Sequence, residues 1–161
     1  MPHLDVDLTS REVSALTAAG ISCLRSLPGG GRVVWSARTM DGADAAGSPW
    51  KYLSVRRTAL FIEESVQRGT TRVGAEATTE QTWAQVRSAV TAFMHSRFEA
   101  GAFPATSIER DAYTVACGPD TMTPDEIAAG VLTMTVGFAP IRAGEFVTVQ
   151  VRQATPLGGR A

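Results

Sequence analysis

Two neighbouring carboxylates, Glu63 and Glu64, are the first candidates for chemistry in this sequence of 161 residues. A pair of carboxyl groups can share a proton, or act as acid and base on either side of a substrate bond. These two fall in a stretch with helical periodicity, where adjacent side chains point about 100° apart. They cannot flank one substrate bond, so we expect no acid–base pair at this place.

Histidines and cysteines form no metal-binding pattern. His3 stands near the start of the chain, and His95 falls on the outer arc of a long predicted helix without an acidic or thiol group at ligand spacing. Cys23 and Cys117 are far apart in the sequence and lack the short spacing of paired zinc ligands. We predict two buried free thiols, no metal ion and no cofactor.

Glycine and serine motifs are incomplete as well. Gly29-Gly30-Gly31-Arg32 lacks the Lys-Ser/Thr ending of a phosphate-binding loop and the helix that should follow it. Ser36 has neither flanking glycine of a nucleophile elbow. No residue is predicted to be catalytic or to bind a cofactor, and the chain is predicted not to be an enzyme. A free-standing small-molecule enzyme or binding domain is the alternative from another functional class.

Arginines are the polar residues that most favour a role in contacts. The planar guanidinium groups of Arg38, Arg56 and Arg57 suit carboxylates across packed surfaces. We expect structural or inter-subunit ion pairs at these arginines and at Glu145. The alternative is solvated surface charge that contributes little to stability.

Composition excludes several classes of partner. The net charge is −1, and acidic and basic residues are interspersed without a basic block, which argues against nucleic acid. No stretch approaches the roughly 20 apolar residues of a membrane span, and the N-terminal residues lack the features of a signal peptide. We predict a soluble protein that is assembled in the cytoplasm and has no direct membrane insertion.

Several helices are predicted from caps and periodicity. Thr9 and Glu12 have capping-box spacing before a helix over 10–19. A strand at 52–55 is expected to pass into a helix over 57–68. The strongest helix is predicted over 79–98, with Thr78 as N-cap and Gln81 completing the capping box.

Strands dominate the last third of the sequence. Alternating residues predict strands at 113–117, 132–138 and 146–152, and a short helix at 124–130 begins with a threonine cap and a proline. A short strand is also expected at 33–35, and all three tryptophans are predicted in the core: Trp35, Trp50 and Trp83.

These elements predict an α+β fold. We expect one compact domain over 1–161, with a small mixed or antiparallel sheet flanked by helices. Its ordered core is expected at about 8–152, followed by a flexible tail at 153–161.

Five segments, in this order, resemble the C-terminal domain of contractile tail sheath proteins, the contracting sleeves of phage tails, R-type pyocins and related injection systems. The resemblance runs from about Leu8 to Val151, nearly the whole chain. The segments that carry it are Pro28–Arg32, Trp35–Thr39, Trp50–Arg57, Phe61–Ser65 and Ala139–Phe146.

The resemblance implies a structural subunit of a contractile sheath around an inner tube, polymerising by strand exchange and contracting to drive the tube. Its implied partners are other copies or sheath paralogues in stacked six-subunit rings, the inner tube protein, and baseplate and cap proteins. The assembly would form part of a virion or a released particle. The alternative is a cap-proximal or baseplate-proximal paralogue without outer domains.

The final strand is the main candidate for exchange, because a free strand with apolar faces exposes unpaired backbone groups. The predicted inter-subunit strand comprises Phe146, Val147, Thr148, Val149, Gln150, Val151 and Arg152. Its predicted hinge comprises Pro140, Arg142 and Gly144. The short helix that carries Asp125 and Glu126 is the candidate for facing the tube.

Overall fold

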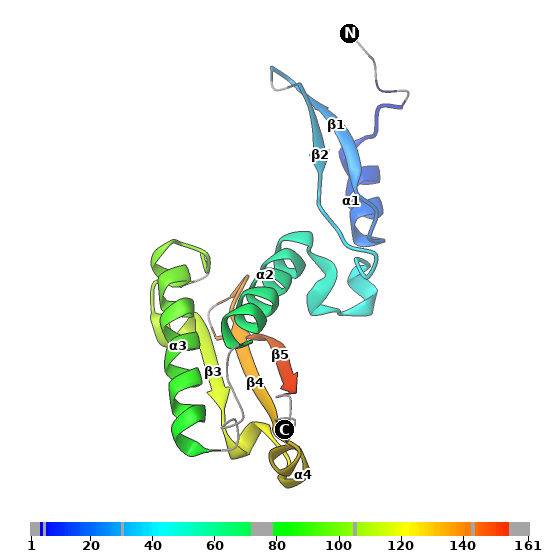
Figure 1. Cartoon of the computed structure of the whole chain (residues 1–161). Coiled ribbons are helices and arrows are strands. Elements are labelled where there is room, and N and C mark those ends of the chain that lie inside the picture. Colours follow the sequence, from blue (N-terminus) through cyan, green and yellow to red (C-terminus); the bar gives the residue numbers. More distant parts are fainter. Residues whose placement is uncertain are drawn as a thin grey trace. The chain divides into compact units, whose positions relative to one another are not determined.

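The computed structural model describes residue 4 and residues 6–29, 31–71, 79–104, 106–142 and 144–154. They form four α-helices and two antiparallel sheets, which confirms the predicted α+β class (Figure 1). The chain divides into two compact units, Met1–Leu60 and Phe61–Ala161. Whether both units fold as one domain stays a prediction.

The first unit begins with helix α1 (Ser10–Ala18) and a hairpin of strands β1 (Cys23–Leu27) and β2 (Gly31–Trp35). Thr9 and Glu12 form the predicted capping box of α1. Strand β1 was not predicted as a strand, because its residues show no clean alternation. Glycines at both ends of the turn, Gly29 and Gly31, have a positive φ of 73°, which this tight connection requires.

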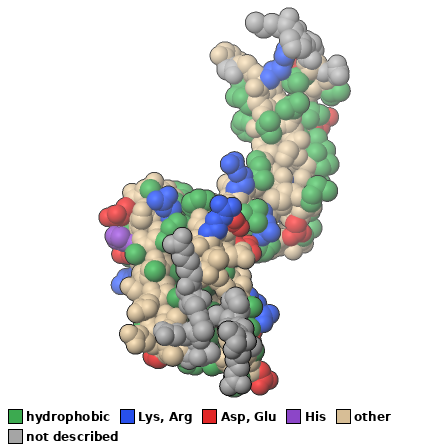
Figure 2. All heavy atoms as spheres, in the orientation of Figure 1, with side chains coloured by type: hydrophobic (Ala, Val, Ile, Leu, Met, Phe, Trp, Pro, Cys, Tyr) green, Lys and Arg blue, Asp and Glu red, His purple; other side chains and the backbone are tan. Residues whose placement is uncertain are grey.

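Few side chains of the first unit are buried. Val13 of α1 and Cys23 of β1 lie in its interior, whereas Leu24 and Val34 are exposed on the other face of the hairpin. Hydrophobic side chains accordingly reach the surface over this unit (Figure 2). Trp35 is exposed too, so its predicted core position is wrong.

Helix α2 (Leu53–Thr70) follows two short 3₁₀ turns, Asp44–Ala46 and Pro49–Lys51. The prediction of a strand through 52–55 is wrong, because only Tyr52 pairs as an isolated bridge, with Arg38, and the helix starts at the next residue. The helical stripe already begins at Val55 and continues with three further buried residues: Ala59, Ile62 and Val66.

Helix α3 (Glu80–Glu99) belongs to the second unit. Its N-cap is Thr79, whose hydroxyl accepts a hydrogen bond from the Thr82 N–H at 3.2 Å. The predicted Thr78–Gln81 box was therefore wrong by one residue, and Thr78 lies outside the described residues. The buried stripe of α3 comprises Trp83, Val86, Val90 and Met94.

The sheet of the second unit has the order β3-β4-β5, with β3 at Tyr113–Cys117, β4 at Val131–Phe138 and β5 at Val147–Ala154. Helix α3 packs alongside β3 (Figure 1). One face of central β4 is fully buried: Leu132, Met134, Val136 and Phe138 are each 0% exposed. On the opposite face Thr133 is also buried, and its hydroxyl has no hydrogen-bond partner among the described residues.

Helix α4 (Pro124–Ala128) lies between β3 and β4 in the chain, after the 3₁₀ turn Pro119–Thr121. Thr123 and Glu126 form a capping box around its start, as predicted from the threonine, the proline and the glutamate. The helix contacts β4. This docking is what allows so short a helix to persist.

Candidate assembly surfaces

The predicted exchange strand, apart from Phe146, lies in β5, which pairs with β4 of the same chain. Eight residue pairs join the two strands, from Phe138↔Val147 to Val131↔Ala154. The strand thus continues two residues beyond the expected start of the tail, while residues 155–161 lie outside the described residues. Val149 and Val151 are buried, and the alternate residues Thr148, Gln150 and Arg152 are exposed. The structure holds a single chain, so donation of β5 to another copy stays a prediction.

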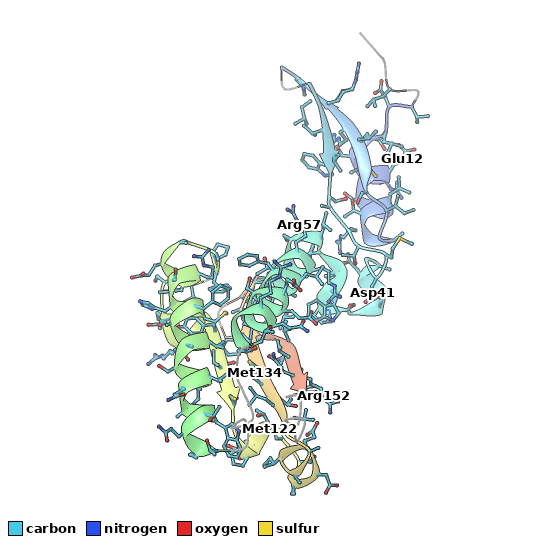
Figure 3. The ribbon with its side chains drawn as sticks, in the orientation of Figure 1. Glu12, Asp41, Arg57, Met122, Met134 and Arg152 are labelled. Carbon is cyan, nitrogen blue, oxygen red and sulfur yellow. The ribbon has the colours of Figure 1, made fainter. Side chains whose placement is uncertain are left out.

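Two side-chain contacts hold β5 from outside the sheet. Thr70, at the end of α2, donates its hydroxyl hydrogen to the Gln153 Oε1 atom at 2.6 Å. Arg152, labelled on β5 in Figure 3, forms an ion pair with Glu126 of α4. The strand therefore contacts both helices through its last residues.

The predicted hinge lies in the connection between β4 and β5. At its start the Ala139 N–H donates to the Ala112 carbonyl at 2.8 Å, and at its end the Gly144 N–H donates to the Asp111 carbonyl at 3.1 Å. Gly144 has a φ of 75°, which a side chain would strain. Arg142 and Glu145 form an exposed ion pair at 3.2 Å. These contacts fix the two ends of the connection and leave its middle exposed.

The two acidic residues of α4 have different surroundings. Asp125 is exposed, and its side chain has no hydrogen bond or ion pair with another described residue. Glu126 is half-buried: it caps the helix through the Thr123 N–H at 2.9 Å and also binds Arg152. The Thr123 backbone hydrogen bond lowers the pKa of Glu126 below its usual value. Of the two, Asp125 is thus the one that is unengaged among the described residues.

Arg38 forms a clamp within its own unit. Its guanidinium binds Asp44 at 2.8 Å, and Lys51 binds the same carboxylate at 3.0 Å. The Arg38 side chain is only 7% exposed, and it stacks over the Tyr52 ring. The hydrogen bonds from Lys51 and then Arg38 lower the pKa of Asp44. Arg38 thus forms a structural ion pair with Asp44 inside its own chain.

Arg56 and Arg57 lie side by side in the sequence of α2 but differ in their contacts. The Arg56 guanidinium lies over the Trp50 ring, with its carbon 5.2 Å from the ring centre. Neither arginine forms an ion pair with an acidic group in the part of the chain that the structure describes. Both cations remain available to a partner.

Among the described residues, His95 has two acidic neighbours, Glu99 on the same helix and Glu109 from a distant part of the sequence. Its Nδ1 atom lies 2.8 Å from a Glu109 carboxylate oxygen, and its Nε2 atom lies 3.4 Å from Glu99. The Tyr113 hydroxyl donates to the same Glu109 oxygen. The expectation of no acidic group at ligand spacing is thus wrong. Glu99 follows His95 by four residues on the same helix, and folding brings Glu109, 14 residues away, to α3.

This cluster shifts three pKa values. The hydrogen bond to Glu109 raises the pKa of His95, and the Tyr113 hydroxyl, followed by His95, lowers the pKa of Glu109. Burial, and then Glu109, raises the pKa of Tyr113 to about 12. No group of three or more His, Cys, Asp or Glu side chains among the described residues could hold a metal ion. His3 lies outside them. Cys23 and Cys117 are buried free thiols, as predicted.

The family model for the phage tail sheath C-terminal domain matches residues 45–154, which include α2, α3, α4 and the whole β3-β4-β5 sheet. The chain belongs to the phage tail sheath family. This confirms the family resemblance drawn from the sequence segments. Comparison of this sheath domain with curated proteins returned no match.

Two solved structures are similar to the sheath domain. One is the baseplate of the anti-feeding prophage, with a TM-score of 0.72, 30% identity and coverage of 94% of this chain. The other is the helical sheath of the same particle in its contracted state, with a TM-score of 0.69, 30% identity and coverage of 90%. The chain spans only 41% and 40% of those chains' lengths. Among the described residues no helix is both long and apolar enough to cross a bilayer.

Proposed function

We propose that this domain is a structural part of a contractile sheath that polymerises around an inner tube and contracts to drive it. The match of the sheath family model to residues 45–154 carries the proposal, because that range contains the strand, the hinge and the short helix. Likeness to a contracted helical sheath supports it. The assembly would consist of stacked six-subunit rings, with baseplate and cap proteins at its ends.

Strand exchange would join the copies. In the proposed assembly β5 of one copy takes the place of β5 in another and makes the same eight residue pairs with β4. Domain swapping of this kind preserves the intramolecular contacts, so its main cost is the rearranged connection. That connection contains the predicted hinge residues Pro140, Arg142 and Gly144. The predicted exchange segment, Phe146 to Arg152, supplies six of the eight pairs, and Gln153 and Ala154 would move with it.

Helix α4 would face the tube through Asp125. A contact that must release during contraction should be small and polar. Asp125 meets this requirement because it is exposed and unengaged among the described residues, whereas Glu126 is occupied by the helix cap and Arg152.

Contraction in this proposal requires no reactive group. Interfaces between rigid units have discrete packing arrangements, so an extended lattice can repack into a shorter one when its contacts are released. Strands shared between copies would keep the lattice connected during this change.

A baseplate-proximal role is the second candidate. Likeness to a chain of the anti-feeding prophage baseplate favours it, with 94% of this chain covered. Such a protein should form single rings and no long tubes when produced with its tube protein, which negative-stain images would distinguish.

Truncation after Gly144 tests strand exchange. The shortened chain, produced with the tube protein, should form no tubes in negative-stain images, because β5 is lost. Since the truncation also exposes β4, a second variant, Pro140→Gly, removes the proline constraint from the hinge without removing the strand. Tubes of undiminished length from both variants would contradict strand exchange.

Charge reversal tests the tube contact. Asp125→Lys should reduce co-purification with the tube protein, whereas Asp7→Lys reverses another exposed acidic residue and should not. Equal co-purification of both variants and the unaltered chain would refute a tube-facing role for α4.

A further inference from the structure

A pocket of about 430 Å³ lies in the first unit, away from β5 and α4 in the chain. It is lined by Thr39, Met40, Asp41, Trp50 and Arg56. Asp41 is labelled in Figure 3. These residues come from the segment before the first 3₁₀ turn, from the second turn and from the first turn of α2.

Hydrogen bonds hold the walls of this pocket in place. The Thr39 hydroxyl donates to the Trp50 carbonyl at 2.9 Å and accepts from the Asp41 N–H at 3.2 Å. The Thr39 N–H donates to the Lys51 carbonyl at 3.1 Å. Both walls are thus tied together, so binding would require little ordering of the backbone.

The lining has the composition of a protein interface. Met, Trp and Arg are enriched where partners bury surface. The Met40 side chain is fully exposed, at 105% of its reference area, although burying it would be favourable. Beside it Trp50 is half-buried. A partner that covers these residues would remove apolar area from water.

Arg56 supplies the charged group with which the pocket would recognise its partner. Its guanidinium lies over the Trp50 ring, and the cation–π contact holds the group at the pocket. The planar guanidinium has donors that can bind a carboxylate through two hydrogen bonds. The Arg56 side chain has no hydrogen bond or ion pair within the described part of the chain.

Asp41 limits, by its charge, how negative a ligand of this pocket can be. It puts a negative charge on the same pocket and forms no ion pair with Arg56, since no acidic oxygen lies within 4.0 Å of the Arg56 guanidinium among the described residues. Asp41 repels every anion, and it repels a phosphate or another polyanion more strongly than a single carboxylate. One carboxylate next to an apolar side chain, as on a protein segment, fits better.

We propose that this pocket is a docking site for a carboxylate-bearing segment of a second copy of this chain. Charge complementarity at Arg56 and the likeness to a helical sheath, in which copies are neighbours, favour this occupant. The proposal rests on the proposed function, and it adds a side-chain contact that is separate from strand exchange.

Charge reversal at two exposed arginines of the first unit provides the first test. Arg56→Glu should raise the protein concentration needed for tube formation about tenfold or more. The control Arg11→Glu makes the same change in net charge at an exposed residue of α1 outside the pocket, and it should assemble like the unaltered chain. Arg56→Lys, which keeps the charge but loses the planar fork, should have an intermediate effect.

Cross-linking provides the second test. A photo-reactive amino acid at Met40, whose side chain is fully exposed, should form a covalent dimer only in assembled material. Mass spectrometry should identify an acidic peptide of this same chain. A cross-link to the tube protein, or no cross-link, would overturn the proposal.

Failure of the pocket and failure of the sheath function give different outcomes. Tubes that form equally well with Arg56→Glu, or equally poorly with both charge reversals, overturn the pocket and leave the sheath function intact. An unaltered chain that never assembles with its tube protein refutes the sheath function and the pocket with it.

Discussion

The two units of this sheath domain are built from different balances of apolar and polar contacts. The second unit encloses a strand, β4, with four side chains that are 0% exposed and a helix that packs beside the sheet. The first unit buries few side chains, and its hairpin exposes Leu24 and Val34. Its loops are held by charged clamps around Arg38. The second unit therefore contains a core of its own, whereas the first unit presents apolar surface that a partner can cover.

Replacing one large side chain by alanine in each unit should give the largest difference in the free energy of unfolding. Met134→Ala in β4 should lower the free energy of unfolding by about 2–5 kcal/mol, because it leaves a cavity in a closed core. Leu24→Ala in the hairpin should change it by about 0.5 kcal/mol or less, because that side chain is already exposed. Urea denaturation of the isolated chain measures both. Similar losses of stability for the two variants would contradict the difference in packing between the two units.

Removal of the clamp in the first unit should have a smaller effect. Arg38→Ala should lower the free energy of unfolding by about 1–3 kcal/mol, since it deletes charged hydrogen bonds and stacking over Tyr52. Arg57→Ala, at an exposed residue, serves as control and should be nearly neutral. Denaturant titration compares the two, and an unaffected Arg38→Ala would show that the polar clamp does not hold this unit.

The smallest expected difference between the units is in how pH changes their stability, and the two changes should have opposite signs. The pKa of Asp44 is lowered in the folded first unit, so its contribution to stability exists above its unfolded pKa and is lost as the pH falls through the folded value. The pKa of His95 is raised in the second unit, so its contribution exists below the unfolded pKa and is lost as the pH rises through the folded value.

Thermal unfolding of two variants measures these responses. The stability advantage of the unaltered chain over His95→Gln should shrink from about pH 6 to about pH 8. Its advantage over Asp44→Asn should shrink towards about pH 3. A His95→Gln difference that does not vary with pH would contradict the pair with Glu109.

Local signals predicted most of the helices and strands. The capping boxes of α1 and α4 and the alternation in β3, β4 and β5 each involve residues a few positions apart. The errors arose where two local patterns competed. At 52–55 the β-prone residues suggested a strand, but Val55 belongs to the helical stripe of α2. In β1 the alternation was too weak to reveal the first strand of a hairpin.

The candidate surfaces were predictable as segments but not as contacts. The sequence alone singled out Arg38 and Arg56, yet it could not distinguish a clamped arginine from an available one. It also treated Asp125 and Glu126 as equivalent, although Glu126 is engaged by Thr123 and by a β5 residue 26 positions away. The carboxylate next to His95 was missed for the same reason.

The sequence by itself determined the α+β class, the caps, most element boundaries and the sheath family, because periodicity, cap chemistry and ordered motifs act over short spans of chain. Only the tertiary structure decided that β5 completes its own sheet in a single chain, that Asp44 binds both Arg38 and Lys51, and that the Arg56 guanidinium lies over the Trp50 ring beside an open pocket. These pairings depend on which distant side chains folding brings within a few ångströms, and local spacing carries no information about that distance.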